Sequence, residues 1–110
     1  MVQELGYPKG LIAVEKGFSH QGRRFDILCY ANLSGTLAPL LLVECKAGTL
    51  SQEAFQQALG YNETIRSPFI CLANQTEIST YWRQQGVWAS VPFLPSYAQL
   101  VERLCVSSKP

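Results

Sequence analysis

The stretch Pro39-Leu-Leu-Leu-Val-Glu-Cys-Lys46 decides the fold of this 110-residue chain. Its apolar first half is typical of a strand buried on both faces of a sheet. A carboxylate and an ammonium group then follow two positions apart. Because charged groups inside a sheet are costly, the pattern predicts a central strand that runs out into a polar cleft. Alternation along the strand assigns Leu40, Leu42, Glu44 and Lys46 to one face, and Leu41, Val43 and Cys45 to the other.

Further strand and helix patterns lie on both sides of this stretch. Two strand patterns precede it, at Leu11 to Lys16 and Arg23 to Tyr30, and predict an antiparallel meander. A helix follows from Thr49 to about Arg66, with Thr49 and Gln52 as a capping box. The next apolar segment, Phe69 to Ala73, is another strand, and strand–helix–strand at this length implies a parallel pair.

The C-terminal third predicts a hairpin and a last helix. The hairpin joins strands at Glu77 to Trp82 and Val87 to Val91. The helix opens at Pro95-Ser96, where Ser96 and Gln99 repeat the capping pattern. The expected fold class is therefore α/β, a mixed β-sheet flanked by helices in a single domain over residues 1–110.

Composition narrows the functional classes. Nine Lys and Arg against eight Asp and Glu give a net charge of +1, which excludes an overall basic field for nucleic acid. With 47% hydrophobic and 15% charged residues, part of the surface is expected to be hidden in a partner or homodimer. The cysteines lie in apolar runs without metal-type spacing, and no apolar run is long enough for a signal peptide or membrane span. A cytoplasmic protein with reduced thiols at Cys29, Cys45, Cys71 and Cys105 is expected.

Three charged residues form the candidate site. If the Arg23 and Leu40 strands are neighbours, Asp26 and Glu44 converge at one edge of the sheet. Two carboxylates with a main-chain carbonyl suit Mg²⁺, which shares its coordination shell with substrate phosphates. Lys46 could orient a water molecule and stabilise the charge that develops during phosphodiester hydrolysis.

The same residues resemble a known family. Asp26 followed by Glu44-Cys45-Lys46 at the end of an apolar strand resembles the PD-(D/E)xK nuclease signature, although Phe25 stands in place of its proline. Gln57 to Tyr61 resembles the accompanying QxxxY motif. From Gly6 to Trp82 the chain is similar to the N-terminal nuclease-like domain of type I restriction enzyme R subunits. The segments that carry this similarity are Gly6-Tyr7-Pro8, Glu15, Arg24 to Ile27, Leu42 to Ala47 and Ala73-Asn74.

The resemblance implies a restriction-endonuclease-like fold and a role for each site residue. Asp26 and Glu44 would bind Mg²⁺ or Mn²⁺ together with the carbonyl of Cys45, and Lys46 would be the catalytic lysine. Supporting residues would be Gln57 and Tyr61, one helical turn apart, and an N-terminal acid, either Glu15 or Glu4.

The resemblance also bears on substrate and partners. It implies a Mg²⁺-dependent nuclease acting on DNA. Lys16, Arg23 and Arg24 would join Lys46 in weak binding without sequence specificity. The first core helix is expected to be short or missing, which would leave one flank of the sheet uncovered and favour a homodimer or a helicase-type partner.

Structural roles would explain the same residues differently. Lys46 could form an ordinary ion pair with Asp26 or Glu44, and Gln57 with Tyr61 could be an ordinary helix flank. Trp82 and Trp88 would then be packing residues. The corresponding function is a non-catalytic module that keeps the nuclease fold and binds a partner protein or nucleic acid.

Overall fold

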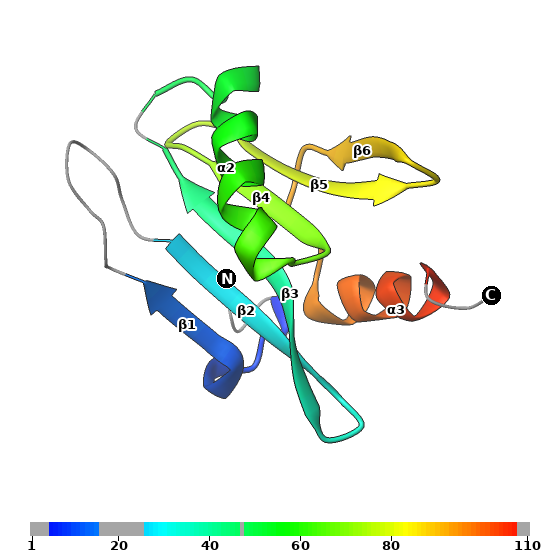
Figure 1. Cartoon of the computed structure of the whole chain (residues 1–110). Coiled ribbons are helices and arrows are strands. Elements are labelled where there is room, and N and C mark those ends of the chain that lie inside the picture. Colours follow the sequence, from blue (N-terminus) through cyan, green and yellow to red (C-terminus); the bar gives the residue numbers. More distant parts are fainter. Residues whose placement is uncertain (1–4, 16–25, 47, 108–110) are drawn as a thin grey trace.

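The computed structural model describes residues 5–15, 26–46 and 48–107, excepting the side chains of 14, 15, 26, 61, 64 and 105–107. One six-stranded sheet in the order β1-β2-β3-β4-β5-β6 forms the centre, and helices lie against it (Figure 1). The elements are η1 (Lys9–Leu11), β1 (Ile12–Glu15), β2 (Asp26–Leu33), β3 (Thr36–Cys45), α2 (Gln52–Ile65), β4 (Phe69–Ala73), β5 (Ile78–Gln84), β6 (Val87–Val91) and α3 (Tyr97–Ser107).

The strand directions confirm the predicted topology. β1, β2 and β3 form an antiparallel meander, and β4, β5 and β6 form a second one. The two meet where β3 runs parallel to β4, and α2 makes the connection between them. The β2–β3 and β5–β6 hairpins each turn on two residues with positive φ, Ser34-Gly35 and Gln85-Gly86, a conformation that matches the twist of paired strands.

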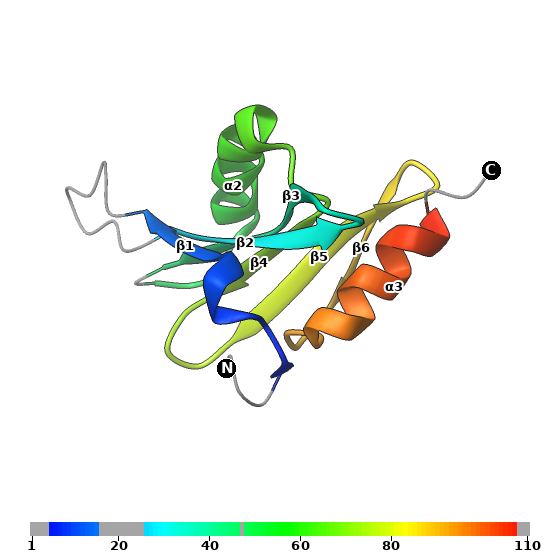
Figure 2. The ribbon, with the colours of Figure 1, turned by 90° about the horizontal axis from the view of Figure 1, so that it is seen from below.

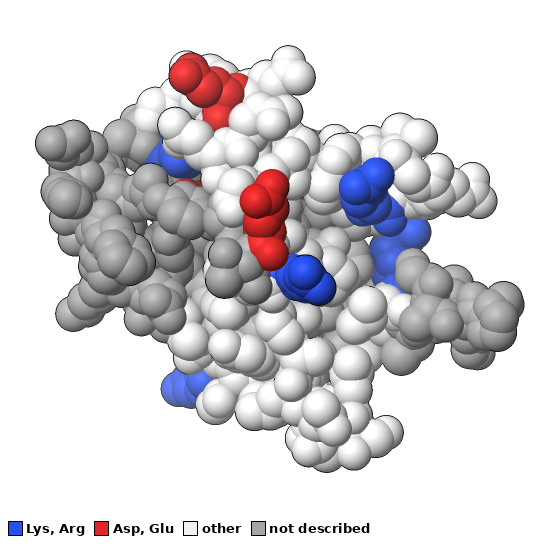
Figure 3. Space-filling model, in the orientation of Figure 1, with Lys and Arg blue, Asp and Glu red and all other residues white. Residues whose placement is uncertain are grey.

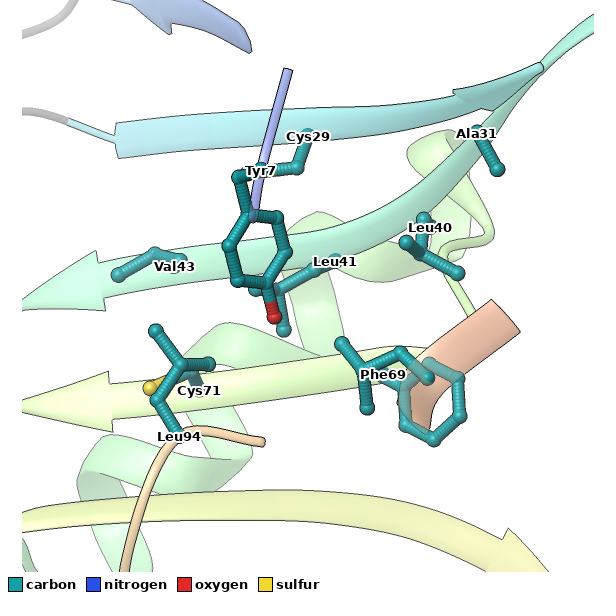
Figure 4. Packing of buried hydrophobic residues seen from close by; sticks show 10 residues of the cluster. Tyr7, Cys29, Ala31, Leu40, Leu41, Val43, Phe69, Cys71 and Leu94 are labelled. Carbon is teal, nitrogen blue, oxygen red and sulfur yellow. The ribbon is translucent and has the colours of Figure 1, made fainter. Parts of the chain in front are cut away.

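The two helices cover opposite faces of the sheet. Figure 2 shows α2 on one face, with α3 and η1 on the other. The α3 face holds the larger core cluster, to which Tyr7, Leu94 and Leu100 contribute from outside the sheet (Figure 4). The Tyr7 hydroxyl donates a 2.7 Å hydrogen bond to the carbonyl of Pro95, 88 positions away. The expectation of an uncovered flank is therefore wrong for the described part of the chain, because the C-terminal helix covers it.

The α2 face carries a second core cluster. Ala54 and Ala58 of α2 lie against Ile70 and Leu72 of β4, and all four are buried. Small residues on the helix allow it to approach the sheet closely. This packing fixes α2 above the centre of the sheet, beside the strand that carries the candidate site.

A β-bulge changes the alternation of β3. Cys29 of β2 is opposite Leu41, but the next residue, Tyr30, is opposite Pro39, so Leu40 is an extra residue in β3. Leu40 and Leu41 consequently belong to the same core cluster on the α3 face. The prediction that Leu40 shares a face with Glu44 is therefore wrong. The prediction that Val43 lies on the face opposite Glu44 is confirmed.

Capping agrees with prediction at one helix and differs at the other. In α3 the capping box is confirmed, since Gln99 N–H donates to Ser96 Oγ and Ser96 N–H donates to Gln99 Oε1. In α2 the cap is Ser51 rather than Thr49, and its hydroxyl accepts a 3.1 Å hydrogen bond from Ala54 N–H. Leu50 packs against the α2-face cluster, which sets the entry of the chain and moves the helix start two residues later.

None of the helices in the described part of the chain is both long and apolar enough to span a membrane.

Candidate functional site

Three acidic positions align across neighbouring strands. Glu15 of β1 is directly opposite Asp26 of β2, and Asp26 is directly opposite Glu44 of β3. Directly paired positions of an antiparallel ladder belong to the same face of a sheet. We call these three positions the acid row. It crosses the sheet where β1 and β3 end and β2 begins, so the predicted convergence of Asp26 and Glu44 is confirmed at the level of backbone register.

Glu44 occupies a buried position on the α2 face. Its neighbour across the parallel ladder is Leu72, a member of the α2-face cluster, and only 1% of the Glu44 surface is exposed. A carboxylate withdrawn from water to this extent needs compensating charge or hydrogen bonds. Part of that compensation comes from Lys46, whose Nζ lies 3.5 Å from Glu44 Oε1.

Lys46 is held by both the sheet and α2. Its backbone N–H donates a 2.8 Å hydrogen bond to the carbonyl of Ala73, which extends the β3–β4 ladder one residue beyond β3. Its Nζ donates a 2.9 Å hydrogen bond to Oε1 of Gln57, on α2. The structure thus places Gln57, which was predicted only as a supporting residue, in contact with the lysine. The ammonium group is fixed between a strand carboxylate and a helix amide.

Asn74 is a site residue whose role the sequence did not reveal. Its side-chain amide donates a 2.8 Å hydrogen bond to the carbonyl of Gly48, in the loop after β3. Its Oδ1 accepts hydrogen bonds from the N–H groups of Thr76 and Glu77, which closes the β4–β5 turn. Asn74 therefore connects the end of β4 to the loop that follows Lys46. The signal in the sequence is an asparagine directly after a fully apolar strand.

The other predicted residues are described in part or not at all. Tyr61 lies one turn after Gln57 in α2, and Cys45 is paired with Ala73. Their assigned roles stay predictions. Glu15 and Asp26 are placed by backbone register alone. The predicted residues that lie outside the described part of the chain are Glu4, Lys16, Arg23 and Arg24.

Among the described side chains, which do not include those of Glu15 and Asp26, no group of three His, Cys, Asp or Glu residues could hold a metal ion. The donor chemistry of the acid row nevertheless fits a hard divalent cation, because all three residues supply carboxylate oxygens. Aligned carboxylates also repel one another across strands, and a bound cation relieves that repulsion. The row is thus compatible with Mg²⁺ or Mn²⁺.

The cysteines on the opposite face are poor candidates for chemistry. Cys29 and Cys71 are buried free thiols in the α3-face cluster. Burial raises the pKa of the Cys29 thiol to about 11. Burial is also the largest of the effects that raise the pKa of the Cys71 thiol to about 11. Both are therefore held as neutral thiols, which are neither nucleophiles nor metal ligands.

Comparison with known proteins identifies the family. The model of the type I restriction enzyme R protein N terminus (HSDR_N) matches residues 1–94. No significant match was found among curated proteins or among solved structures. The matched segment includes the acid row, Lys46, Gln57 and Asn74. The chain therefore belongs to the family of type I restriction enzyme R protein N-terminal domains.

Proposed function

We propose that this domain is a metal-dependent nuclease of the PD-(D/E)xK type that hydrolyses phosphodiester bonds in DNA. The observation that carries the proposal is the direct pairing of Asp26 with Glu44, next to a lysine that is held in place on the same strand. Membership of a restriction enzyme family supports a role in cutting DNA. Family membership alone does not supply the chemistry, which depends on these residues.

The carboxylates would bind the metal. Asp26 and Glu44 offer the hard oxygen donors that Mg²⁺ or Mn²⁺ prefers, and the carbonyl of Cys45 is the candidate for a further donor. Glu15 is aligned with the two carboxylates in register, which favours it over Glu4 as the additional acid of the site. When bound, the cation would act as a Lewis acid and lower the pKa of water.

Lys46 and Gln57 would act on the phosphate. The Gln57 amide accepts one hydrogen of the Lys46 ammonium group, and Glu44 Oε1 lies 3.5 Å from the same nitrogen, which leaves one N–H direction for a substrate oxygen. An ammonium group fixed before the reaction stabilises the negative charge that grows on the phosphate in the transition state. Gln57 is then a positioning residue that acts through Lys46.

The reaction itself consumes one water molecule. The water oxygen forms a bond to phosphorus while the bond from phosphorus to a sugar oxygen breaks. The released sugar oxygen takes up a proton, so the products are one phosphate end and one hydroxyl end.

A non-catalytic module is the second candidate. The observation that favours it is the burial of Glu44, which is 1% exposed and already close to an ammonium group. In that case the pair would be a structural remnant, and the domain would bind DNA or a partner protein without cutting.

A cleavage assay separates the two functions. End-labelled single-stranded DNA, linear and circular duplex DNA, and RNA are incubated with the protein and Mg²⁺, Mn²⁺ or EDTA. We expect metal-dependent cleavage of at least one DNA form, and a loss of at least about 100-fold in Asp26→Asn, Glu44→Gln and Lys46→Gln.

The matched control is Glu102→Gln, which removes an exposed carboxylate on α3. It should cleave like the wild type. The proposal is wrong if the folded wild type cuts none of the DNA forms with either metal, or if the three site variants retain wild-type rates.

A further inference from the structure

A second candidate site lies at the other end of α2. A cavity of about 790 Å³ opens between the last turn of α2, the start of β4, the β5–β6 hairpin and α3. Lys46 and Gln57 are near the end of β3 and the first half of α2, whereas this cavity is lined by Arg66 and Phe69. The cavity is therefore separate from the acid row, at the opposite end of β4.

Positive charge dominates the lining. Arg66, Arg83 and Arg103 come from three different elements, and Glu63 is the single acidic residue among the lining residues. Figure 3 shows blue side chains gathered beside the lower end of α2 and between the β5–β6 hairpin and α3. Within the described part of the chain, none of the three guanidinium groups is within ion-pair distance of a carboxylate. An uncompensated cluster of this kind attracts anions.

Tryptophan rings hold two of the arginines in place. The guanidinium carbon of Arg103 lies 4.9 Å from the ring centroid of Trp82, and that of Arg83 lies 5.7 Å from the ring centroid of Trp88. Arg103 Nη1 and Trp82 Nε1 also donate to the same Gln84 oxygen. Arginine planes and aromatic faces side by side are typical of surfaces that bind nucleic-acid strands. The two guanidinium groups are positioned before any ligand arrives.

The third arginine occupies a backbone position that is unfavourable for its side chain. Arg66 ends α2 in the left-handed conformation, with φ 62° and ψ 41°. Glycine is the residue that usually takes this place, because a side chain there is strained. An arginine at a position where glycine is more favourable suggests a use for its charge.

We propose that this cavity, defined by Arg66, Arg83 and Arg103, is a second nucleic-acid contact that takes phosphate groups of a strand engaged by the domain. The proposal rests on the proposed function, since it extends the path of the substrate beyond the acid row. Guanidinium groups fit phosphate through paired hydrogen bonds, and their weak hydration suits a site beside aromatic rings.

Salt-dependent binding without metal tests the proposal. Fluorescence anisotropy of a labelled single strand and of its duplex is measured in EDTA over a series of salt concentrations. All proteins carry Glu44→Gln, so cleavage plays no part. We expect Arg66→Gly, Arg83→Gln and Arg103→Gln each to reduce the slope of log affinity against log salt by about 0.7 for the single strand, or about 0.9 for the duplex. The form whose slope falls by its expected amount, while the slope of the other form stays unchanged, is the one that the cavity binds.

Arg66→Gly distinguishes weaker binding caused by loss of the charge from weaker binding caused by loss of folding. It removes the charge and also the strained side chain, so it should melt at the wild-type temperature or above while binding more weakly. Lys9→Gln is the matched control, because it removes an exposed cation on η1 that does not line the cavity. Its slope and affinity should stay unchanged.

The proposal is overturned if the arginine variants keep the slope of the parent protein, or if Lys9→Gln reduces it equally. It is also overturned if a polyglutamate peptide displaces the strand and binds more tightly, which would assign the cavity to an acidic protein partner. Reduced slopes in the arginine variants together with an inactive wild type would support the cavity and refute only the nuclease.

Discussion

The Nζ of Lys46 lies 3.5 Å from Oε1 of Glu44, two residues earlier on the same strand. The carboxylate is 1% exposed, and the lysine side chain keeps 17% of its surface exposed. Burial of such a pair contributes little net stability, because the cost of removing both charges from water offsets their attraction. The stability of the sheet therefore does not by itself explain the pair, whereas the proposed nuclease function would, and this difference can be measured.

Stability measurements should show whether the Glu44–Lys46 pair contributes to the free energy of unfolding. Lys46→Met should lower the free energy of unfolding by about 3 kcal/mol, because it leaves the buried Glu44 carboxylate without its ammonium group. Glu44→Leu combined with Lys46→Met should recover most of that loss and still be inactive. Urea unfolding without metal gives the values. A double variant that remains at least as unstable as Lys46→Met alone would show that the pair supports the structure.

Metal binding should stabilise the folded protein. A divalent cation at ten times its dissociation constant adds about 1.4 kcal/mol, which raises the melting temperature by about 5 °C for a domain of this size. The rise with Mg²⁺ or Mn²⁺ should disappear in Asp26→Ala and Glu44→Ala and persist in Glu102→Ala. Equal shifts in all four proteins would place the cation somewhere other than the acid row.

Gln57 should affect turnover rather than substrate affinity. Loss of its hydrogen bond frees the Lys46 ammonium group, so we expect Gln57→Ala to lower kcat about 10-fold, or about 1.4 kcal/mol, with little change in KM. Gln56→Ala is the control, because Gln56 is an exposed glutamine one position earlier on the same helix. Steady-state kinetics compares the two. A change confined to KM would place Gln57 in substrate binding instead.

Alkaline pH should destabilise the α3-face cluster. Burial raises the pKa of the Cys29 and Cys71 thiols from 9.0 to about 11, so the folded state holds their protons more tightly than the unfolded state. Their contribution is fully present below pH 9 and is lost as the pH rises toward 11, on the order of 2 kcal/mol for each thiol. Burial raises the pKa of the Tyr7 hydroxyl too, which acts in the same direction at higher pH.

Urea unfolding at several pH values tests this linkage. A variant with Cys29→Ala and Cys71→Ala should lose less stability between pH 9 and pH 11 than the wild type does. Parallel pH profiles for the two proteins would contradict it.

Local sequence patterns predicted much of the fold. The apolar run before Glu44 specified a central strand, and the Ser96 and Gln99 spacing specified a helix start, because both depend on neighbouring residues alone. The pairing of Asp26 with Glu44 also followed from the short connection between their strands. These features needed no knowledge of distant contacts.

Features that depend on distant contacts were predicted wrongly or not at all. The cover over the α3 face requires Tyr7 to meet Pro95, and the sequence contains no local signal for that contact. Thr49 and Ser51 are equally suited to cap a helix, and the packing of Leu50 decided between them. The arginine cavity was missed for the same reason, since Arg66, Arg83 and Arg103 are far apart in the chain.

The extra residue at Leu40 has a consequence for how this domain can change. With regular pairing from the turn at Ser34-Gly35, Asp26 would stand opposite Val43, and Glu44 would lie on the face of α3, away from Gln57. The extra residue shifts the pairing register by one position between the hairpin tip and the acid row. The register of the outer half of the β2–β3 hairpin is therefore independent of the register of the acid row. Relatives can therefore lengthen, shorten or reshape the hairpin tip for other contacts, while Asp26 and Glu44 stay opposite each other.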